Sequence, residues 1–125
     1  MSRFHLSIVV ANFEQTKYFY LNLLECPLGR DAGSWVDIQF YGHQLTIHKE
    51  SELQKAQAID HFGLIQTQPI WESTLKLCKL KGAKFVMPVC IKNKGESDES
   101  GKFIVQDPAA NLIEFKYYKI GRAHV

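Results

Sequence analysis

The sequence contains few of the residues that mark specialised classes of protein. Among 125 residues there are three cysteines and four prolines, and no apolar run reaches the roughly 18 residues that cross a bilayer. The cysteines, Cys26, Cys78 and Cys90, are odd in number and far apart, which argues against a disulfide framework and a paired-cysteine zinc site. No apolar signal segment precedes the first strand-like run. We therefore expect a soluble cytoplasmic protein with reduced thiols.

Charge of either sign is not in large excess. The 15 Lys and Arg residues offset 13 Asp and Glu residues to a net charge of +2, and the lysines are scattered among acids. This pattern gives no basic stripe of the kind that binds nucleic acid. We expect neither nucleic acid nor a membrane as a partner. With 46% hydrophobic residues the chain can bury a core without disulfides, so residues 1–125 are predicted to form one domain.

The first half of the chain alternates strand-like and helical patterns. Its predicted elements are a strand over 4–10, a helix over about 13–24, and two strands over 34–40 and 44–48. Asn12 followed by Gln15 resembles a capping box at the start of the helix, and Pro27 prevents a longer helix. The turn Tyr41-Gly42-His43 joins the last two strands, which indicates a hairpin.

The second half repeats this order. Its predicted elements are a strand over 61–66, a helix opened by Pro69 and closed by Gly82, and strands near 85–91, 102–106 and 112–118. Each half is interpreted as a βαβββ module, about 3–49 and about 60–119, with a linker over about 50–59. One helix covers only one face of such a sheet. We predict an α+β fold whose paired modules form a curved mixed sheet around a cleft, within one chain or between two.

Three side chains in these modules have the chemistry of metal ligands. His5 and His61 each lie on a strand that leads into a helix, and Glu114 lies on the last strand. If a pseudo-twofold axis relates the modules, both histidines lie near it and the closing strand supplies the carboxylate. Two imidazoles and one carboxylate leave coordination positions open, as a catalytic metal requires. We predict a divalent ion, Fe²⁺, Mn²⁺, Zn²⁺ or Ni²⁺, at His5, His61 and Glu114.

A fourth ligand is expected on the closing strand of the first module. Counting from the turn places Thr46 there, whereas matching the apolar neighbours places His48 there. Because strand side chains alternate, Gln44, Thr46 and His48 share one face, so the wall of the cleft is polar with either choice. The sequence leaves the two alternatives open.

The residues resemble the vicinal oxygen chelate superfamily, which includes glyoxalase I, the fosfomycin and bleomycin resistance proteins and the extradiol dioxygenases. The resemblance spans about residues 3–119. Its most specific segments are Phe4-His5-Leu6, Cys26-Pro27, Tyr41-Gly42-His43-Gln44, His61-Phe62-Gly63, Asp107-Pro108-Ala109-Ala110-Asn111 and Leu112-Ile113-Glu114-Phe115-Lys116. It implies that His5, His61 and Glu114 match the metal-ligand positions, usually in a homodimer. One departure is Ala110, where glycine is common in the family.

The resemblance also limits the reaction. Glyoxalase I would have a second glutamate on the strand 44–48, and this chain has no carboxylate there. Glyoxalase activity is therefore disfavoured, because that carboxylate is the proton-transfer base. By analogy with similar proteins, His48 is the candidate proton carrier. The candidate substrate-binding residues are Arg30, Gln44, Thr46 and Lys116, with Lys94 and Glu96 as further candidates for an oxygen-rich or anionic ligand.

The predicted function is that of a metal-dependent enzyme, dioxygenase-like or lyase-like. Its small substrate would chelate the ion through two adjacent oxygens, and the ion would act as a Lewis acid. The alternatives are a metal-free binding protein of the bleomycin resistance type and a thiol transferase that inactivates an epoxide antibiotic such as fosfomycin. The sequence does not choose the substrate, the metal or the reaction type.

Overall fold

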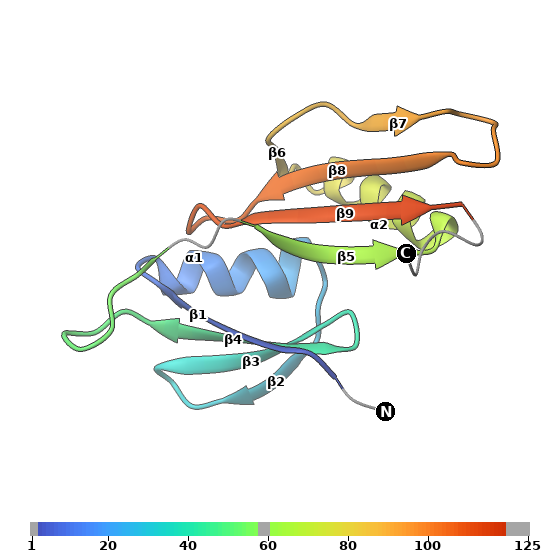
Figure 1. The fold of residues 1–125 in the computed structure, drawn as a ribbon. Coiled ribbons are helices and arrows are strands. Elements are labelled where there is room, and N and C mark those ends of the chain that lie inside the picture. The colour runs from blue at the N-terminus through green and yellow to red at the C-terminus, as the bar shows by residue number, and fades with distance from the viewer. Residues whose placement is uncertain (1–2, 58–60, 120–125) are drawn as a thin grey trace. The chain divides into compact units, whose positions relative to one another are not determined.

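The computed structural model describes residues 3–57 and 61–119, which form two compact units (Figure 1). Within the described residues, unit 1 comprises 3–57 and 108–110, and unit 2 comprises 61–107 and 111–119. Each unit contains one mixed sheet and helical structure, so the predicted α+β class is confirmed. The end of the predicted linker, at 58–59, lies outside the described residues.

Unit 1 has the predicted order of strand, helix and further strands. Its elements are β1 (His5–Val10), α1 (Phe13–Tyr18), the π-helix η1 (Phe19–Leu23), β2 (Leu28–Asp31), β3 (Trp35–Phe40) and β4 (His43–Lys49). The sheet order is β1-β4-β3-β2, with β1 parallel to β4 and the other pairs antiparallel. Strand β2 is a short, exposed strand that the alternation pattern did not locate.

Apolar residues of alternate strand positions form the core of unit 1. Val36, Ile38 and Ile47 are fully buried, and Tyr20 from η1 is buried with them. Burying a side chain of this size contributes about 1.5–3 kcal/mol to folding. The opposite face of the same strands carries the polar residues, as the period of two requires. The helical segment therefore covers one sheet face and leaves the other for the site.

The helix of unit 1 departs from its prediction in two ways. It ends as an α-helix at Tyr18 and continues as the π-helix η1, in which the Leu24 N–H donates to the carbonyl of Phe19, five residues earlier. The predicted capping box is absent, because the Asn12 side chain makes no capping bond and instead donates to the carbonyl of Pro108. A sequence pattern cannot show that a distant carbonyl competes for this amide.

The hairpin prediction is confirmed. Phe40 pairs with His43, and the two residues between them, Tyr41 and Gly42, have φ of 52° and 85°. Two positive φ values are the mark of a type I′ turn, whose twist matches that of the flanking strands. The turn therefore fixes the register of β3 against β4.

Unit 2 repeats the topology of unit 1. Its elements are β5 (Phe62–Gln66), α2 (Gln68–Leu80), β6 (Lys84–Phe85), β7 (Cys90–Lys92), β8 (Ser100–Gln106) and β9 (Leu112–Tyr118). Strand β5 is parallel to β9, and β9, β8 and β6 follow in antiparallel order, with β7 also paired to β8. The predicted strand over 85–91 is split in two, because Pro88 has no N–H to donate to a ladder.

Aromatic residues between α2 and the sheet form the core of unit 2. Trp71 is 1% exposed, and its indole N–H donates to the carbonyl of Phe115 at 2.9 Å. Its ring lies 4.7 Å from the ring of Tyr117 and 5.5 Å from that of Phe103. A buried indole needs such an acceptor. These contacts place α2 on one face of the sheet, behind β8 and β9 in Figure 1.

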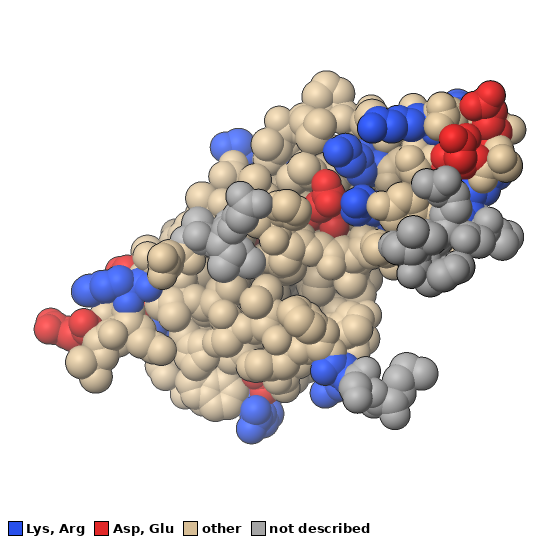
Figure 2. Space-filling model, viewed as in Figure 1, with Lys and Arg blue, Asp and Glu red and all other residues tan. Residues whose placement is uncertain are grey.

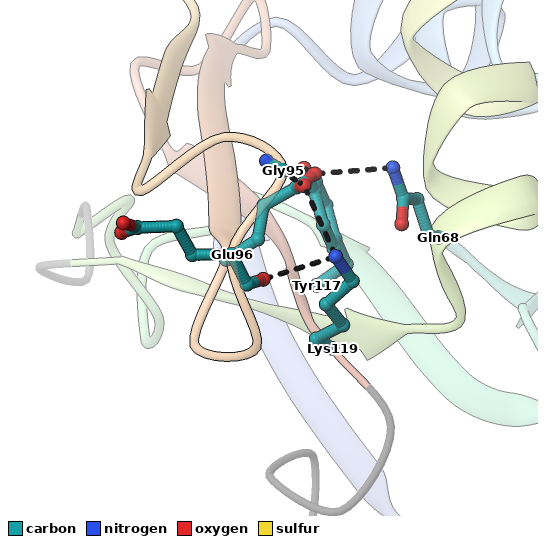
Figure 3. A network of polar contacts seen from close by, with 6 residues as sticks. Gln68, Gly95, Glu96, Tyr117 and Lys119 are labelled. Atoms are coloured by element: carbon teal, nitrogen blue, oxygen red, sulfur yellow. Dashed lines mark hydrogen bonds and ion pairs between the residues drawn. The ribbon is translucent and has the colours of Figure 1, made fainter.

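A buried carboxylate anchors the loop between β7 and β8. Glu99 accepts hydrogen bonds from the Tyr117 hydroxyl, the Gly95 N–H and the Gln68 amide, and Lys119 lies 3.7 Å from it (Figure 3). The hydrogen bond from Tyr117 is the main cause that lowers the pKa of Glu99. Burial, and then Glu99 itself, raises the pKa of Tyr117. The network thus favours an ionised Glu99 beside a neutral phenol.

We expect Glu99→Gln to lower stability at neutral pH and to make it less sensitive to acid. A group whose pKa is lowered by folding stabilises the protein above its unfolded pKa, about 4.3 for Glu, and loses this contribution as pH falls. Urea unfolding of the wild type and the variant should therefore converge at low pH. Glu96→Gln is the control, since the Glu96 carboxylate points away from the network in Figure 3. A difference that persists unchanged at low pH would contradict this account.

The turn before β9 contains a residue in a strained conformation. Asp107 and Asn111 close the turn, with the Asn111 N–H donating to the Asp107 carboxylate at 2.8 Å. Between them Ala110 has φ of 71°, which lies in the left-handed region. A Cβ in this region costs about 1–2 kcal/mol, and glycine avoids this cost. The backbone at Ala110, where glycine is common in the family, is therefore locally strained.

We expect Ala110→Gly to stabilise the protein by about 1 kcal/mol, because relief of the left-handed strain exceeds the entropy that glycine loses on folding. Chemical unfolding of both proteins measures this difference. Ala109→Gly is the control, because Ala109 is not among the residues with positive φ. Equal destabilisation by both substitutions would show that Ala110 is not strained.

Two further expectations concern the cysteines and membranes. Cys26, Cys78 and Cys90 are free thiols, as their spacing predicted. Burial raises the pKa of the Cys26 and Cys78 thiols to about 12, whereas Cys90 is partly exposed. Among the described residues, no helix has the length and apolar character that a membrane crossing needs.

Candidate functional site

His5 begins β1 on the sheet face opposite the core of unit 1. It pairs with Gln44 of β4, and its Nδ1 lies 2.7 Å from the Gln44 Oε1. An amide oxygen only accepts, so Nδ1 is the donor and the lone pair of the neutral ring is on Nε2. This is how an outer hydrogen bond orients a histidine that binds a metal. His5 is exposed and therefore accessible to an ion.

A buried acid lies on the same face. Asp37 of β3 is 5% exposed, accepts a hydrogen bond from the Thr46 hydroxyl at 2.7 Å, and is paired with the Arg30 Nε at 2.7 Å. Burial alone would raise the pKa of Asp37, but the hydrogen bonds from Thr46 and Arg30 and the Arg30 charge outweigh it. The pKa of Asp37 is lowered and the group is ionised at neutral pH. The Thr46 hydroxyl thus donates its proton to Asp37, and the lone pairs of the Thr46 oxygen can accept a further hydrogen bond.

His48 lies two residues beyond Thr46 on this face. It is half-buried, and its ring centroid lies 6.3 Å from that of Trp35, its partner in β3. The guanidinium of Arg30 lies 5.1 Å from the centroid of the Trp35 ring. Arg30, Thr46 and His48, all predicted from the sequence, therefore share the face that carries His5.

In unit 2 the corresponding face carries Glu114. Its side chain is 15% exposed, and the Lys116 Nζ lies 3.9 Å from its Oε1. Glu114 pairs with Gly63 of β5, and a Cβ added to Gly63 would lie only 1.7 Å from the Glu114 carbonyl oxygen. The glycine is therefore required for the close approach of the two backbones. His61, which is exposed, directly precedes β5.

The strand registers favour one of the two alternatives for the fourth position. Two residues after His61, Gly63 pairs with Glu114, and two residues after His5, Ser7 pairs with Thr46. Thr46 is therefore the equivalent of Glu114 in the first module. His48 pairs with Val9 instead, about 7 Å further along the strand. His48 is thus available for a role other than a ligand.

The predicted ligands come from both units, with His5 in unit 1 and His61 and Glu114 in unit 2. In the described part of a single chain, no three His, Cys, Asp or Glu side chains form a group that could hold a metal ion. The donor set nevertheless fits a divalent ion in its chemistry, because the Gln44 contact engages Nδ1 of His5 and leaves Nε2 to face an ion, and Glu114 carries a carboxyl group. The assembly of the three ligands stays a prediction.

Sequence reasoning missed Asp37. Asp37 follows Val36 in an alternating strand, which is a signal for the polar face, but the pattern of β3 alone does not show which residue of β4 it meets. The register brings Asp37 opposite Thr46 on the neighbouring strand. The Asp37 carboxylate therefore lies beside the position expected for a fourth ligand. It contacts the Thr46 hydroxyl there and does not itself take the place of the missing glutamate.

Comparisons with solved structures agree on the fold. A glyoxalase/bleomycin resistance protein/dioxygenase from Alicyclobacillus acidocaldarius is 28% identical with a TM-score of 0.82, covering 99% of this chain and 96% of that one. A protein from Nocardioides with the same description is 15% identical with a TM-score of 0.71, covering 97% and 85%. The fosfomycin resistance protein FosX from Listeria monocytogenes is 15% identical with a TM-score of 0.69, covering 96% and 95%.

Sequence comparisons find less. No protein-family model matches the chain, and no curated protein matches it. The structural matches extend over nearly all of the chain. This chain therefore has the glyoxalase/bleomycin resistance/dioxygenase fold, the fold of the vicinal oxygen chelate superfamily that its sequence resembles.

Proposed function

We propose that this protein is a metal-dependent enzyme acting on a small molecule that chelates a divalent ion through two adjacent oxygens. His5, His61 and Glu114 would hold the ion. The observation that carries the proposal is the equivalence of the two modules, in which Ser7–Thr46 and Gly63–Glu114 are matching pairs beside the two histidines. Chance placement of two histidines at matching positions, with a carboxylate beside one of them, is a weaker explanation.

The chain's own residues have separate roles in this proposal. The bound ion would polarise the chelated oxygens as a Lewis acid. Thr46, whose proton is held by Asp37, would accept a hydrogen bond from the substrate or a water at the open side. Gln44 would hold His5 in the tautomer with Nε2 free. Arg30 fixes Asp37 and presents most of its guanidinium to solvent, where it would attract an anion.

His48 would carry a proton to or from the substrate through a ring nitrogen. It lies on the face of Thr46, about 7 Å along the strand, and its ring faces Trp35. An imidazole is the side chain best suited to this exchange near neutral pH. We further propose that the enzyme works as a homodimer, because the superfamily that the sequence resembles usually builds each site in a homodimer.

The test is metal analysis followed by turnover. The protein is purified without oxygen, freed of metal with a chelator, and equilibrated in turn with Fe²⁺, Mn²⁺, Zn²⁺ and Ni²⁺. We expect stoichiometric binding of at least one ion. Catechols test the dioxygenase reaction. A thiol with an epoxide such as fosfomycin tests the transferase alternative, since two of the structural neighbours are fosfomycin resistance proteins.

A metal-free binding protein is the rival outcome, in keeping with the bleomycin resistance description of the structural neighbours. His61→Ala separates the two. A binding protein keeps its affinity for bleomycin in this variant, whereas the enzyme loses metal and turnover together. Failure of the wild type to bind any of the four ions above trace level would refute the proposed function.

A further inference from the structure

Two neighbouring residues of β4 hold the chain just before β1. His5 and Gln44 are the first pair of the parallel ladder between the two strands. Beyond this pair, the Phe4 carbonyl accepts a hydrogen bond from the Gln44 N–H at 2.9 Å, and the Phe4 N–H donates to Nδ1 of His43 at 3.0 Å. The His43 side chain thus takes the place of a strand carbonyl. It extends the ladder by one bond beyond the proposed ligand His5.

This contact determines which nitrogen of His43 carries the proton. A backbone N–H can only donate, so Nδ1 of His43 carries a lone pair and the proton of the neutral ring is on Nε2. His5 has the opposite arrangement, because its Nδ1 lies 2.7 Å from the Gln44 Oε1, which is an acceptor. The two imidazoles are therefore suited to different tasks. His43 binds the backbone of β1, and His5 keeps Nε2 for an ion.

The turn before β4 positions the His43 ring. His43 directly follows the turn residues Tyr41-Gly42 and pairs with Phe40 of β3. Its ring centroid lies 6.5 Å from that of Phe4, at an interplanar angle of 75°. Such edge-to-face contacts are preferred between aromatic rings. Figure 2 shows mainly residues other than Lys, Arg, Asp and Glu over β1 and β4, and the contacts at this strand end are likewise between neutral groups.

The position of His5 in the fold makes these contacts important. His5 is exposed and is the first residue of β1, which is an edge strand of the sheet. Strand ends with few buried contacts open locally at little cost. Phe4 is 63% exposed and so contributes little burial. A metal ligand needs a backbone held to within about 0.5 Å, and here the hydrogen bonds at Phe4 supply that restraint.

Unit 2 does not repeat this arrangement. The strand registers place Asn111 in the position equivalent to His43 and Leu112 in the position equivalent to Gln44. The Asn111 amide donates at 3.0 Å to a carboxylate of its own turn, and a leucine side chain cannot hydrogen-bond to an imidazole. A substitution of His43 is therefore expected to act on His5.

We propose that His43 is a positioning residue for His5. Its Nδ1 holds the Phe4 N–H and thereby fixes the backbone from which the His5 ring reaches Gln44. The same backbone position directs Nε2 of His5 toward an ion. This inference rests on the proposed function, because His5 is a ligand in that proposal, but its effect on the His5 ring is measurable without a metal.

The first experiment uses metal-free protein labelled with ¹⁵N and two variants of His43. His43→Leu removes the acceptor, whereas His43→Asn keeps one, because its Oδ1 is bonded to Cγ as Nδ1 is in histidine. Spectra are recorded at about pH 8, above the ordinary histidine pKa of about 6.5. The imidazole ¹⁵N shifts report which nitrogen of His5 carries the proton. Magnetisation transfer from water reports the exchange rate of the Phe4 N–H.

We expect His43→Leu to lower the fraction of His5 that carries its proton on Nδ1. Exchange at the Phe4 N–H should become about 5-fold faster, as the loss of one typical hydrogen bond predicts. Exchange at Ile8, which is buried in the middle of β1, should not change and so shows that the variant is folded. His43→Asn should restore both signals.

His48→Leu is the matched control. It removes an imidazole from the same strand, at a residue that pairs with Val9 and whose ring lies beside that of Trp35. Both signals at the start of β1 should keep their wild-type values in this variant.

The second experiment titrates each metal-free protein with Zn²⁺ alone by calorimetry. His43→Leu should weaken zinc binding about 10-fold, as is typical when a partner outside the ligand set is lost. His43→Asn should recover most of this affinity, which separates a positioning residue from a ligand. Wild-type zinc affinity in His43→Leu would refute the positioning role and leave the proposed function intact.

Three results of the metal-free experiment would also overturn the proposal. The His5 tautomer could persist unchanged in His43→Leu, it could be lost as fully in His48→Leu, or His43→Asn could fail to restore it. A wild type that binds no divalent ion, together with loss of the His5 tautomer in His43→Leu, would refute the proposed function and leave the positioning of His5 by His43 established.

Discussion

Mixing His5→Ala chains with Glu114→Ala chains should restore metal binding that each variant lacks. Each substitution removes one ligand, so the affinity of each variant should fall by more than the roughly 100-fold upper value for loss of an outer-shell partner. If a site takes His5 from one chain and His61 with Glu114 from its partner, a mixed dimer contains one complete site. The two chains are co-expressed with different tags, and the mixed dimer is isolated for metal titration.

The reason to expect sharing between chains is the resemblance to the vicinal oxygen chelate superfamily, which usually builds each site in a homodimer. His5 belongs to unit 1, and the other two proposed ligands belong to unit 2. The experiment therefore places one substitution in each unit. The mixed dimer should bind half as much metal as the wild type. A mixed dimer that binds none, although the wild type binds metal, would contradict sharing between chains.

His48→Ala is the control for this experiment. The registers place Thr46, not His48, in the position equivalent to Glu114. The variant should therefore keep wild-type metal affinity and lose turnover, since its imidazole is the proposed proton carrier. Loss of metal in His48→Ala would instead show that this histidine is a ligand and would revise the register argument.

Gly63→Ser should destabilise the protein strongly, because serine adds a Cβ where β5 and β9 approach closely. Its Cβ would lie 1.7 Å from the carbonyl oxygen and 2.6 Å from the carbonyl carbon of Glu114. Backbone atoms cannot rotate away as a side chain can, so β5 and β9 must separate. Forcing atoms into a packed region typically costs about 1–3 kcal/mol, and we expect the upper part of this range. Urea unfolding with unchanged m-value measures the loss.

The repeated fold supplies the control for this substitution. Ser7 is the equivalent of Gly63 in unit 1 and already carries a side chain opposite Thr46. Ser7→Ala should change the free energy of unfolding by less than about 0.5 kcal/mol, as is usual for an exposed position. Gly63→Ser should also weaken metal binding under native conditions, because it moves the backbone of Glu114. If Gly63→Ser were as stable as the wild type, β9 would be able to move away from β5 with no loss of free energy of unfolding.

Much of this protein follows from the sequence by itself. The period of two along the strands separates the buried Val36, Ile38 and Ile47 from the polar Thr46 and His48, because successive side chains point to opposite faces. Tyr41-Gly42 indicates the turn, since two positive φ values need residues that tolerate them. Both are local properties, so the order of elements and the face of each candidate residue could be predicted.

Only the tertiary structure decided how residues on different strands meet. Whether Thr46 or His48 matches Glu114 depended on the register of β1 against β4, and the importance of Asp37 depended on its position opposite Thr46. Register is set by cross-strand hydrogen bonds and packing between distant segments, and no periodicity within one segment contains that information.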